Sequence, residues 1–168
     1  MALLSDLLDL SGIGRGRLCL RWVSSAEGKL FADYVSQVTE AIAGLGKFQA
    51  QDFRRPLAAL RITLQTPRVR WLMGMEKELV EHHNVYGQKL DPERYQKLLG
   101  DAVEHEYHKA LVLATLTETE GRQVRQLAEK TGLDLRTVST CLVELENASQ
   151  VETAGYDGQH PKFVRKAG

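Results

Sequence analysis

The chain has 168 residues, 43% of them hydrophobic and 26% charged, which is the composition of an ordinary globular protein. Its 22 Lys and Arg residues balance 22 Asp and Glu residues, so net charge alone does not attract it to nucleic acid or to an anionic membrane. No apolar stretch approaches the roughly 20 residues that a membrane-spanning helix needs, and we expect a cytoplasmic protein with no membrane partner.

Residues 1–47 are predicted to form part of an α/β unit, in the order helix, strand, helix. Leucines at helical spacing predict a short helix at the amino terminus. The alternation of side chains over Leu18–Val23 predicts a β-strand covered mainly on one face. Ser24 and Glu27 have the spacing of a capping box, which opens a helix that ends near Gly46. Because one strand cannot form a sheet, we expect this part to complete a larger α/β layer.

Residues 48–103 are predicted to be a helical linker region. Two prolines and clustered arginines indicate a tether that includes a short helix, Leu57–Leu64. A second helix is expected before a polar turn. Asp91 and Pro92 then open another helix, and a separate one is expected over roughly 104–116.

Residues 104–168 are predicted to form a winged-helix domain, which is a helix-turn-helix followed by a β-hairpin. Gly132 stands where the turn between the two helices needs left-handed backbone, and Asp134 can cap the second helix. The turn Gly155–Gly158 between two short strands predicts the hairpin wing. The expected fold class is therefore α+β: a partial α/β unit, a helical linker and a carboxy-terminal winged helix.

If the winged helix binds DNA, its second helix and its wing supply the contacts. Acidic and basic residues are equal in number from Glu120 to Gly168, and Glu144 and Glu146 would repel phosphate. Many winged helices dock on proteins instead, so DNA is the less favoured partner. The candidate nucleic-acid contacts are Arg136, Thr137, Ser139, Thr140, Lys162 and Arg165.

The sequence contains no nucleophile elbow, phosphate loop or cysteine cluster, and we expect no catalytic residue, metal site or bound cofactor in this chain. Cys19 and Cys141 lie far apart inside apolar runs and are expected to be buried thiols. Four histidines suggest a metal or enzyme site, but their spacing is equally typical of an exposed helix face. They are His82, His83, His105 and His108.

The segment Leu18–Phe31, LCLRWVSSAEGKLF, resembles the last part of the iron–sulfur delta subunit of methyl-viologen-reducing hydrogenases. In that family a strand of the form L-x-W-[VI]-S-A-[AS]-E-G precedes a helix that opens with phenylalanine. The whole resemblance extends from Leu3 to Gly46 and covers less than a third of the chain. The matching places are held by Trp22, Val23, Ser24, Glu27, Gly28 and Phe31.

The resemblance implies an adaptor that relays electrons through a two-iron, two-sulfur cluster to the flavin subunit of a heterodisulfide-reductase-like complex. The cysteines that hold the cluster lie upstream of the matching region in that family and have no counterpart here, so we expect no cluster in this chain. The chain is then either the tail of a longer reading frame or a split subunit that joins a cluster-bearing delta-subunit front half. The expected partner interface comprises Leu18, Leu20, Trp22, Glu27 and Phe31.

Two functions follow from these features. The first is an accessory or truncated subunit of a cytoplasmic electron-transfer complex, without a complete cluster site of its own. It would link a hydrogenase or similar donor to a heterodisulfide-reductase-like partner as a non-catalytic subunit of an oxidoreductase complex. The alternative is a winged-helix DNA-binding transcriptional regulator.

Overall fold

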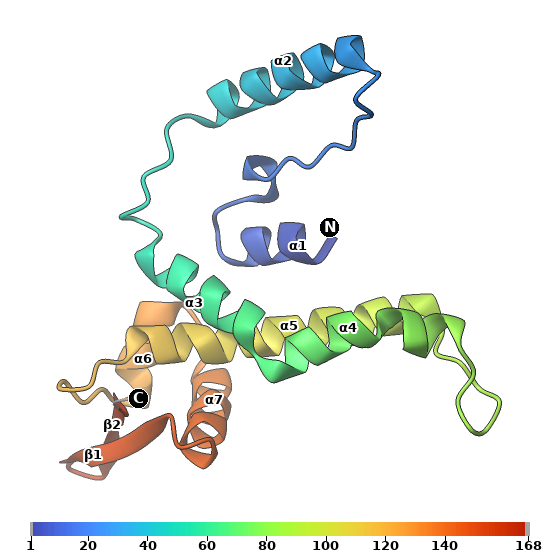
Figure 1. Ribbon diagram of the computed structural model, residues 1–168. Coiled ribbons are helices and arrows are strands. Elements are labelled where there is room, and N and C mark those ends of the chain that lie inside the picture. The colour runs from blue at the N-terminus through green and yellow to red at the C-terminus, as the bar shows by residue number, and fades with distance from the viewer. Residues whose placement is uncertain (1, 167–168) are drawn as a thin grey trace. The chain divides into compact units, whose positions relative to one another are not determined.

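The computed structural model describes residues 2–166. The chain divides into two compact units, one up to Arg54 and one from Arg55 onward. This division falls within the segment that we expected to be a tether. Within the described range the fold is α+β and mostly helical, with seven α-helices and one two-stranded antiparallel sheet (Figure 1). No helix in that range is long and apolar enough to cross a membrane.

The first unit contains two α-helices, α1 (Ala2–Leu10) and α2 (Gly28–Leu45). After α1 the chain turns at Gly12, whose φ of 74° is strained for residues that carry a Cβ atom. A 3-10 turn, η1 (Arg15–Arg17), follows before an open segment leads to α2. Both helices predicted for this part of the sequence are confirmed.

The predicted strand Leu18–Val23 is wrong, because this segment belongs to no sheet within the described residues. Leu18 has the φ of −115° and ψ of 116° of a β-strand, but residues 19–23 make no backbone hydrogen bond inside the range 2–166. A β-strand is stable only beside a neighbouring strand, and the first unit supplies none. The expected helix-strand-helix unit is therefore a helix, an extended segment and a helix.

Helix α2 begins at Gly28, after a turn that contains the predicted capping pair. The Glu27 carboxylate accepts a hydrogen bond from the Ser24 N–H at 2.9 Å, which is one half of a capping box. The Ser24 hydroxyl accepts from the Ala26 N–H at 3.4 Å and not from a helical N–H. The helix consequently starts later than the capping spacing predicts.

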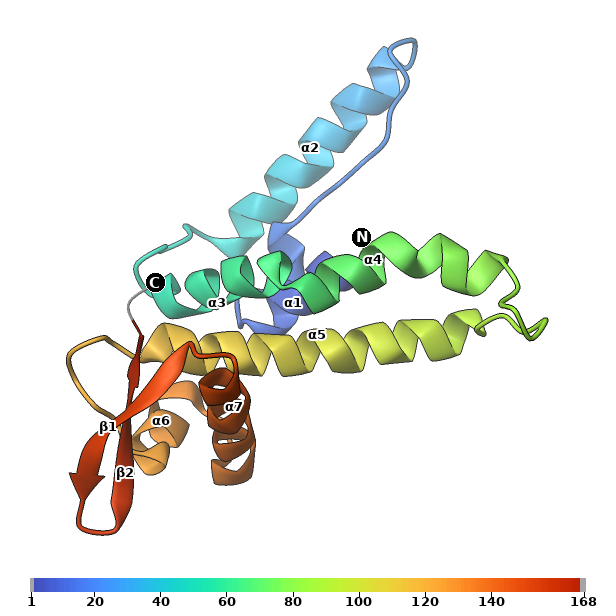
Figure 2. The ribbon, with the colours of Figure 1, turned by 60° about the horizontal axis from the view of Figure 1, so that its bottom comes forward.

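The second unit begins with three helices, α3 (Arg54–Gln65), α4 (Pro67–Glu81) and α5 (Pro92–Thr115). Helices α4 and α5 lie side by side as a helical hairpin (Figure 2). The Tyr95 hydroxyl fastens them together by donating to the Leu72 carbonyl at 2.7 Å. Prolines at the first turns of α4 and α5 start both helices without losing a helical hydrogen bond.

Helix α5 is continuous over 24 residues, whereas we expected one helix to end near Val103 and another to begin at Glu104. Side chains at helical spacing remain buried on both sides of that position, including Ala102, Glu106 and Ala110. One buried face thus continues through the expected break. The boundary that we placed between a linker (48–103) and a winged-helix domain (104–168) falls in the middle of this helix.

Helices α6 (Val124–Thr131) and α7 (Leu135–Asn147) are joined by a tight turn. Gly132 takes the left-handed conformation in this turn, with a φ of 75°. The Asp134 carboxylate caps α7 by accepting from the Thr137 N–H at 3.0 Å. The hydrogen bond from the Thr137 hydroxyl, followed by that from the Thr137 N–H, lowers the pKa of Asp134. The predicted roles of Gly132 and Asp134 are therefore confirmed.

The expected hairpin is present as β1 (Val151–Asp157) and β2 (His160–Arg165), which pair antiparallel. The turn predicted over Gly155–Gly158 is wrong in its position, because β1 continues to Asp157 and the turn lies at residues 158–159. The register shifts between Thr153 and Gly155, where one extra residue bulges out of β1. Arg122, just before α6, forms an isolated bridge with Phe163 and so extends the sheet beyond its two strands. The hairpin is thereby anchored to the helices that precede it.

The main hydrophobic core of the second unit lies between the end of α5, helices α6 and α7, and the hairpin. Leu127 of α6 and Val138 and Leu142 of α7 are buried in this core, and Leu133 packs partly buried against it. The buried members of the core are Val112, Leu113, Leu116, Leu127, Val138, Cys141, Leu142, Leu145, Val151 and Phe163.

Candidate functional site

The residues that we expected to contact a partner lie in the first unit, on the extended segment and around the start of α2. Trp22 is 86% exposed, Phe31 is 58% exposed and Leu20 is 47% exposed. Leu18 is also exposed, and the Glu27 carboxylate is held by the turn before α2. Proteins rarely expose several large apolar side chains together unless another molecule covers them, so this surface is a candidate interface.

Helix α2 has no buried side chain along its 18 residues. It carries an apolar stripe that is exposed at Val35, Ile42 and Leu45. An isolated helix of this length is marginally stable in water, and helices in proteins gain most of their stability by packing an apolar face. The first unit offers α2 no surface that buries this stripe.

The extended segment lies along α2 and is antiparallel to it (Figures 1 and 2). Where the segment starts, the Arg17 guanidinium donates to the carbonyls of Leu45 and Gly46 at 2.9 and 3.3 Å. Farther along, the Arg21 guanidinium lies 5.6 Å from the centroid of the Tyr34 ring. This path of the backbone is that of the first half of a parallel βαβ unit, in which a strand is followed by a helix that runs back beside it.

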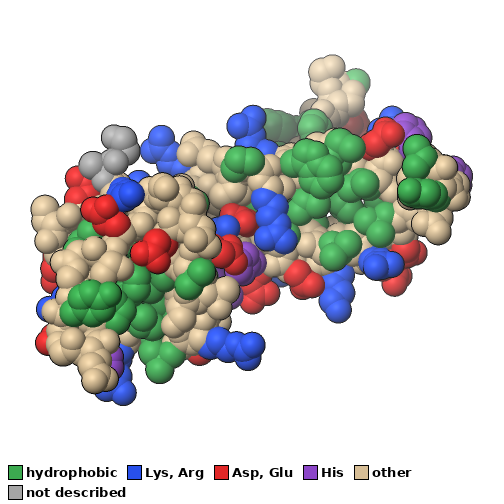
Figure 3. Space-filling view, turned by 90° about the horizontal axis from the view of Figure 1, so that it is seen from below, with side chains coloured by type: hydrophobic (Ala, Val, Ile, Leu, Met, Phe, Trp, Pro, Cys, Tyr) green, Lys and Arg blue, Asp and Glu red, His purple; other side chains and the backbone are tan. Residues whose placement is uncertain are grey.

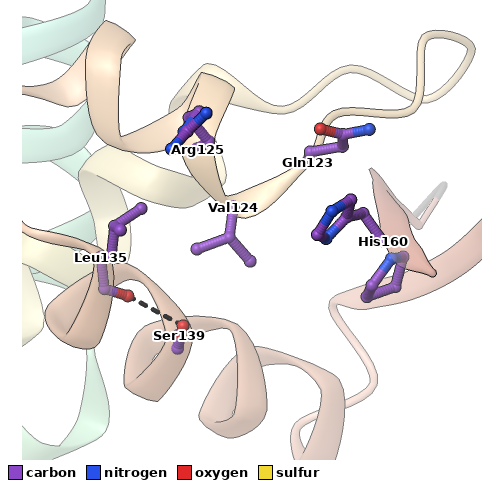
Figure 4. Close-up of a pocket in the computed structure, with 7 residues that line it drawn as sticks. Gln123, Val124, Arg125, Leu135, Ser139 and His160 are labelled. Atoms are coloured by element: carbon purple, nitrogen blue, oxygen red, sulfur yellow. Dashed lines mark hydrogen bonds between the residues drawn. The ribbon is translucent and has the colours of Figure 1, made fainter. Parts of the chain in front are cut away.

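The second unit has an open cavity of about 500 Å³, here called the α6–α7–hairpin groove. Figure 4 shows residues from the start of α6, from α7 and from the hairpin around it, with the Val124 side chain pointing into the space between α7 and the hairpin. Three apolar residues and four polar or charged residues line the groove. Its lining residues are Gln123, Val124, Arg125, Leu135, Ser139, His160 and Pro161.

The predicted nucleic-acid contacts are distributed over α7 and β2, and only Ser139 among them lines the groove. Arg136 and Thr140 are exposed on α7. The Thr137 hydroxyl is engaged with the Asp134 carboxylate at 2.6 Å, so it is part of the helix cap. The other groove residues escaped sequence reasoning, because three separate segments contribute them and no local spacing connects these segments.

Lys162 and Arg165 lie on β2. The Lys162 ammonium pairs with the Asp157 carboxylate at 3.5 Å. Arg165 is exposed, and its backbone N–H donates to the Thr117 carbonyl. The positive charge of Lys162 is thus partly neutralised within the hairpin.

A charged network connects α4, α5 and α7. The Glu106 side chain is only 5% exposed and pairs with Lys109 at 2.9 Å and with Arg68 at 3.7 Å. Lys109 also donates to Glu144 on α7 at 3.1 Å, and His105 lies 2.8 Å from the same carboxylate. Burial raises the pKa of Glu144, but the hydrogen bonds from His105 and Lys109 outweigh it, so this pKa lies below its ordinary value. The network braces α7 against α5.

The four histidines are not gathered into a metal site. Across the described part of the chain, no three His, Cys, Asp or Glu side chains are close enough together to hold a metal ion. His82 pairs with Glu78 at 2.7 Å, and this hydrogen bond raises the pKa of His82. His105 belongs to the charged network, and burial lowers the pKa of His108. Each of these three histidines therefore has its own local surroundings.

The two cysteines differ in environment. Cys141 is buried in the core, as we expected, and burial raises the pKa of its thiol to about 11. The prediction for Cys19 is wrong, because this residue is exposed on the extended segment. Its apolar neighbours did not imply burial, since the segment lacks the covering surface that a sheet would provide.

Among known proteins, the chain matches no family model, no curated protein and no solved structure. The similarity of Leu18–Phe31 to hydrogenase delta subunits thus remains a hypothesis.

Proposed function

We propose that this chain is an accessory subunit of an electron-transfer complex and that its first unit docks on a cluster-bearing polypeptide. The observation that supports this function best is the extended segment 18–23, which exposes Trp22 beside a helix without a buried side chain. Such a surface is costly in water and becomes stable when another chain covers it.

The docking mode follows from the backbone of this segment. Residues 19–23 leave their N–H and C=O groups without a backbone partner inside the described range, as an unpaired strand does. Addition to the edge of a partner's sheet would satisfy these groups, and α2 would then cover one face of that sheet. Leu18, Leu20 and Trp22 alternate along the segment and would all point to the same face.

The nature of the partner is proposed from the resemblance to hydrogenase delta subunits. It would be a delta-subunit front half that carries the two-iron, two-sulfur cluster, or the flavin subunit of a heterodisulfide-reductase-like complex. The partner supplies the thiolates for the cluster, because Cys19 and Cys141 lie far apart in sequence and differ in exposure. This chain then contributes a missing strand and helix, and no redox group.

We further propose that the winged helix predicted over residues 104–168 docks on or braces the complex. Support comes from the left-handed Gly132 between α6 and α7, and from the hairpin that follows α7 directly. The isolated bridge between Arg122 and Phe163 ties the residues before α6 to the hairpin.

A DNA-binding regulator is the second candidate, supported by the exposed Arg136, Ser139 and Thr140 on α7. The charges weaken this candidate, because Lys162 and Lys166 pair with Asp157 and Glu152. A specific DNA whose gel shift disappears at high salt and in Arg136→Ala would favour this candidate over the first.

The electron-transfer proposal can be tested by purifying the tagged full-length chain from its native cells. We expect a stoichiometric complex that shows both flavin and iron–sulfur absorbance. The variant Trp22→Asp should lose this absorbance, because a carboxylate cannot be buried unpaired at the interface. Trp71→Asp is the matched control, since Trp71 is an exposed tryptophan of the second unit and should leave the complex intact.

Two results would contradict the proposal. One is a complex that contains neither flavin nor an iron–sulfur group. The other is full retention of the complex in Trp22→Asp, which would show that the first unit is not the docking surface.

A further inference from the structure

The exposed face of α7 is apolar where it enters the α6–α7–hairpin groove. Leu135 is 51% exposed and Val143 is 57% exposed, and Ser139 lies between them at helical spacing. The Ser139 hydroxyl donates to the Leu135 carbonyl at 2.8 Å, so it is already satisfied and adds little polarity to this face. An apolar stripe therefore runs from the groove along α7.

The length of this stripe fits a short segment of extended chain. Leu135 and Val143 are eight residues apart on one helix, which corresponds to about 12 Å along its axis. An extended peptide covers that distance with about four residues. The apolar residues that line the groove, Val124, Leu135 and Pro161, can contact one large apolar side chain of such a segment.

One arginine lines the groove, and a second one lies next to a lining residue in the chain. Arg125 lines the groove and Arg136 follows Leu135 on α7, and neither side chain has an ion-pair partner between residues 2 and 166. No acidic residue is among those that line the groove. Asp157 accepts a hydrogen bond from Gln123 and pairs with Lys162. Asp134, next to Leu135 in the chain, has no cationic partner within this range either, so Arg125 is the unpaired charge among the residues that line the groove.

We propose that the α6–α7–hairpin groove binds an acidic segment of a partner protein, which inserts one large apolar side chain between α7 and the hairpin. The apolar lining residues favour the inserted side chain, and Arg125 favours a carboxylate beside it. This site is separate from the docking surface of the first unit and goes beyond the proposed function.

A protein segment fits this face better than duplex DNA does. Phosphates would leave Leu135 and Val143 without an apolar neighbour, and the exposed surface of α7 offers one arginine and no lysine. The face combines apolar area with few unmatched cations, which is typical of protein interfaces.

The test is a selection of peptides from a random displayed library on the full chain that carries Trp22→Asp. This background removes the first docking surface, so the outcome does not depend on the proposed electron-transfer role. We expect enriched peptides with one large apolar residue between Asp or Glu residues. Their affinity, measured by fluorescence anisotropy, should fall about tenfold or more in Leu135→Asp and in Arg125→Glu.

Two controls keep the result interpretable. Circular dichroism of both variants reports whether the second unit remains folded, and Leu98→Asp should bind normally because Leu98 is an exposed leucine of α5 that does not line the groove. Arg125→Glu should shift the selection toward peptides with Lys or Arg, which a mere loss of folding would not do.

The proposal is overturned if no peptide is enriched, or if the enriched peptides lack acidic residues. It is equally overturned if folded Leu135→Asp and Arg125→Glu bind the peptides as well as the parent chain does. Stronger enrichment of a duplex from a random DNA pool, with binding lost in Arg136→Ala, would show that the face reads nucleic acid.

Discussion

At the scale of single residues, the two thiols should differ in reactivity. Burial raises the pKa of Cys141 from 9.0 to about 11, which lowers its thiolate fraction at neutral pH about a hundredfold. Cys19 is exposed. We expect a thiol reagent to modify one cysteine quickly in the native protein and the second only after unfolding, as followed by absorbance.

The variant Cys19→Ser is the control for this prediction. It should abolish the fast phase and leave the slow one unchanged. Rapid modification of two thiols in the native wild-type protein would contradict the burial of Cys141.

The buried ion pair of Glu106 and Lys109 gives a second prediction for single side chains. Lys109→Met should destabilise the protein by about 3 kcal/mol, because Glu106 then keeps only the more distant and exposed Arg68. The measurement is urea unfolding followed by circular dichroism. The double variant Glu106→Met/Lys109→Met should recover to within about 1 kcal/mol of the wild type, since no buried charge is left unpaired. Equal losses in the single and double variants would contradict this account.

At the scale of elements, Glu144 makes the packing of α7 on α5 depend on pH. The folded-state pKa of Glu144 lies below its ordinary value of 4.5, so its hydrogen bonds with His105 and Lys109 stabilise the fold above that value. This contribution is lost as the pH falls through the folded-state pKa. Glu144→Gln should therefore be less stable than the wild type at neutral pH and should show a weaker loss of stability on acidification.

The test is to measure the midpoint temperature of thermal unfolding of Glu144→Gln and of the wild type as a function of pH. Glu118→Gln is the matched control, because Glu118 is an exposed glutamate outside the charged network and should leave the pH profile unchanged. A parallel profile for Glu144→Gln and the wild type would show that this brace is not formed in solution.

The helices and the extended segment show which elements can be predicted from the sequence. Helices α1, α2, α6 and α7 follow from apolar stripes and from local start and stop residues, which are short-range signals. The extent of α5 was missed, since no sequence signal shows that α4 and α7 bury successive parts of one long helix. The segment 18–23 has the alternation of a strand but lacks a neighbour, and only a neighbour makes a strand.

The two candidate sites also differ in how much of each the sequence can predict. Trp22 and Phe31 could be singled out because a contiguous motif carries them. The α6–α7–hairpin groove could not, because Arg125, Leu135 and His160 come together only through the packing of α6, α7 and the hairpin. Local patterns predicted the parts of this face, and tertiary structure was needed to assemble them.

At the scale of the whole molecule, buried apolar side chains are unevenly shared between the two units. In the first unit only Leu7 and Ile13 belong to this class among the described residues, whereas the second unit contains a continuous core. Burial of apolar surface provides most of the free energy of folding. The second unit should accordingly be stable by itself, and the first should need its partner.

Two fragments would test this division of stability. Residues 55–168 should unfold in urea with a single cooperative transition, followed by circular dichroism. Residues 1–54 should lose helical signal gradually, without a transition, because α2 has no buried side chain to make its unfolding cooperative. A sharp transition in the fragment 1–54 as a monomer would mean that this unit has a core of its own. A partner chain would then no longer be needed to explain the exposed apolar side chains around Trp22.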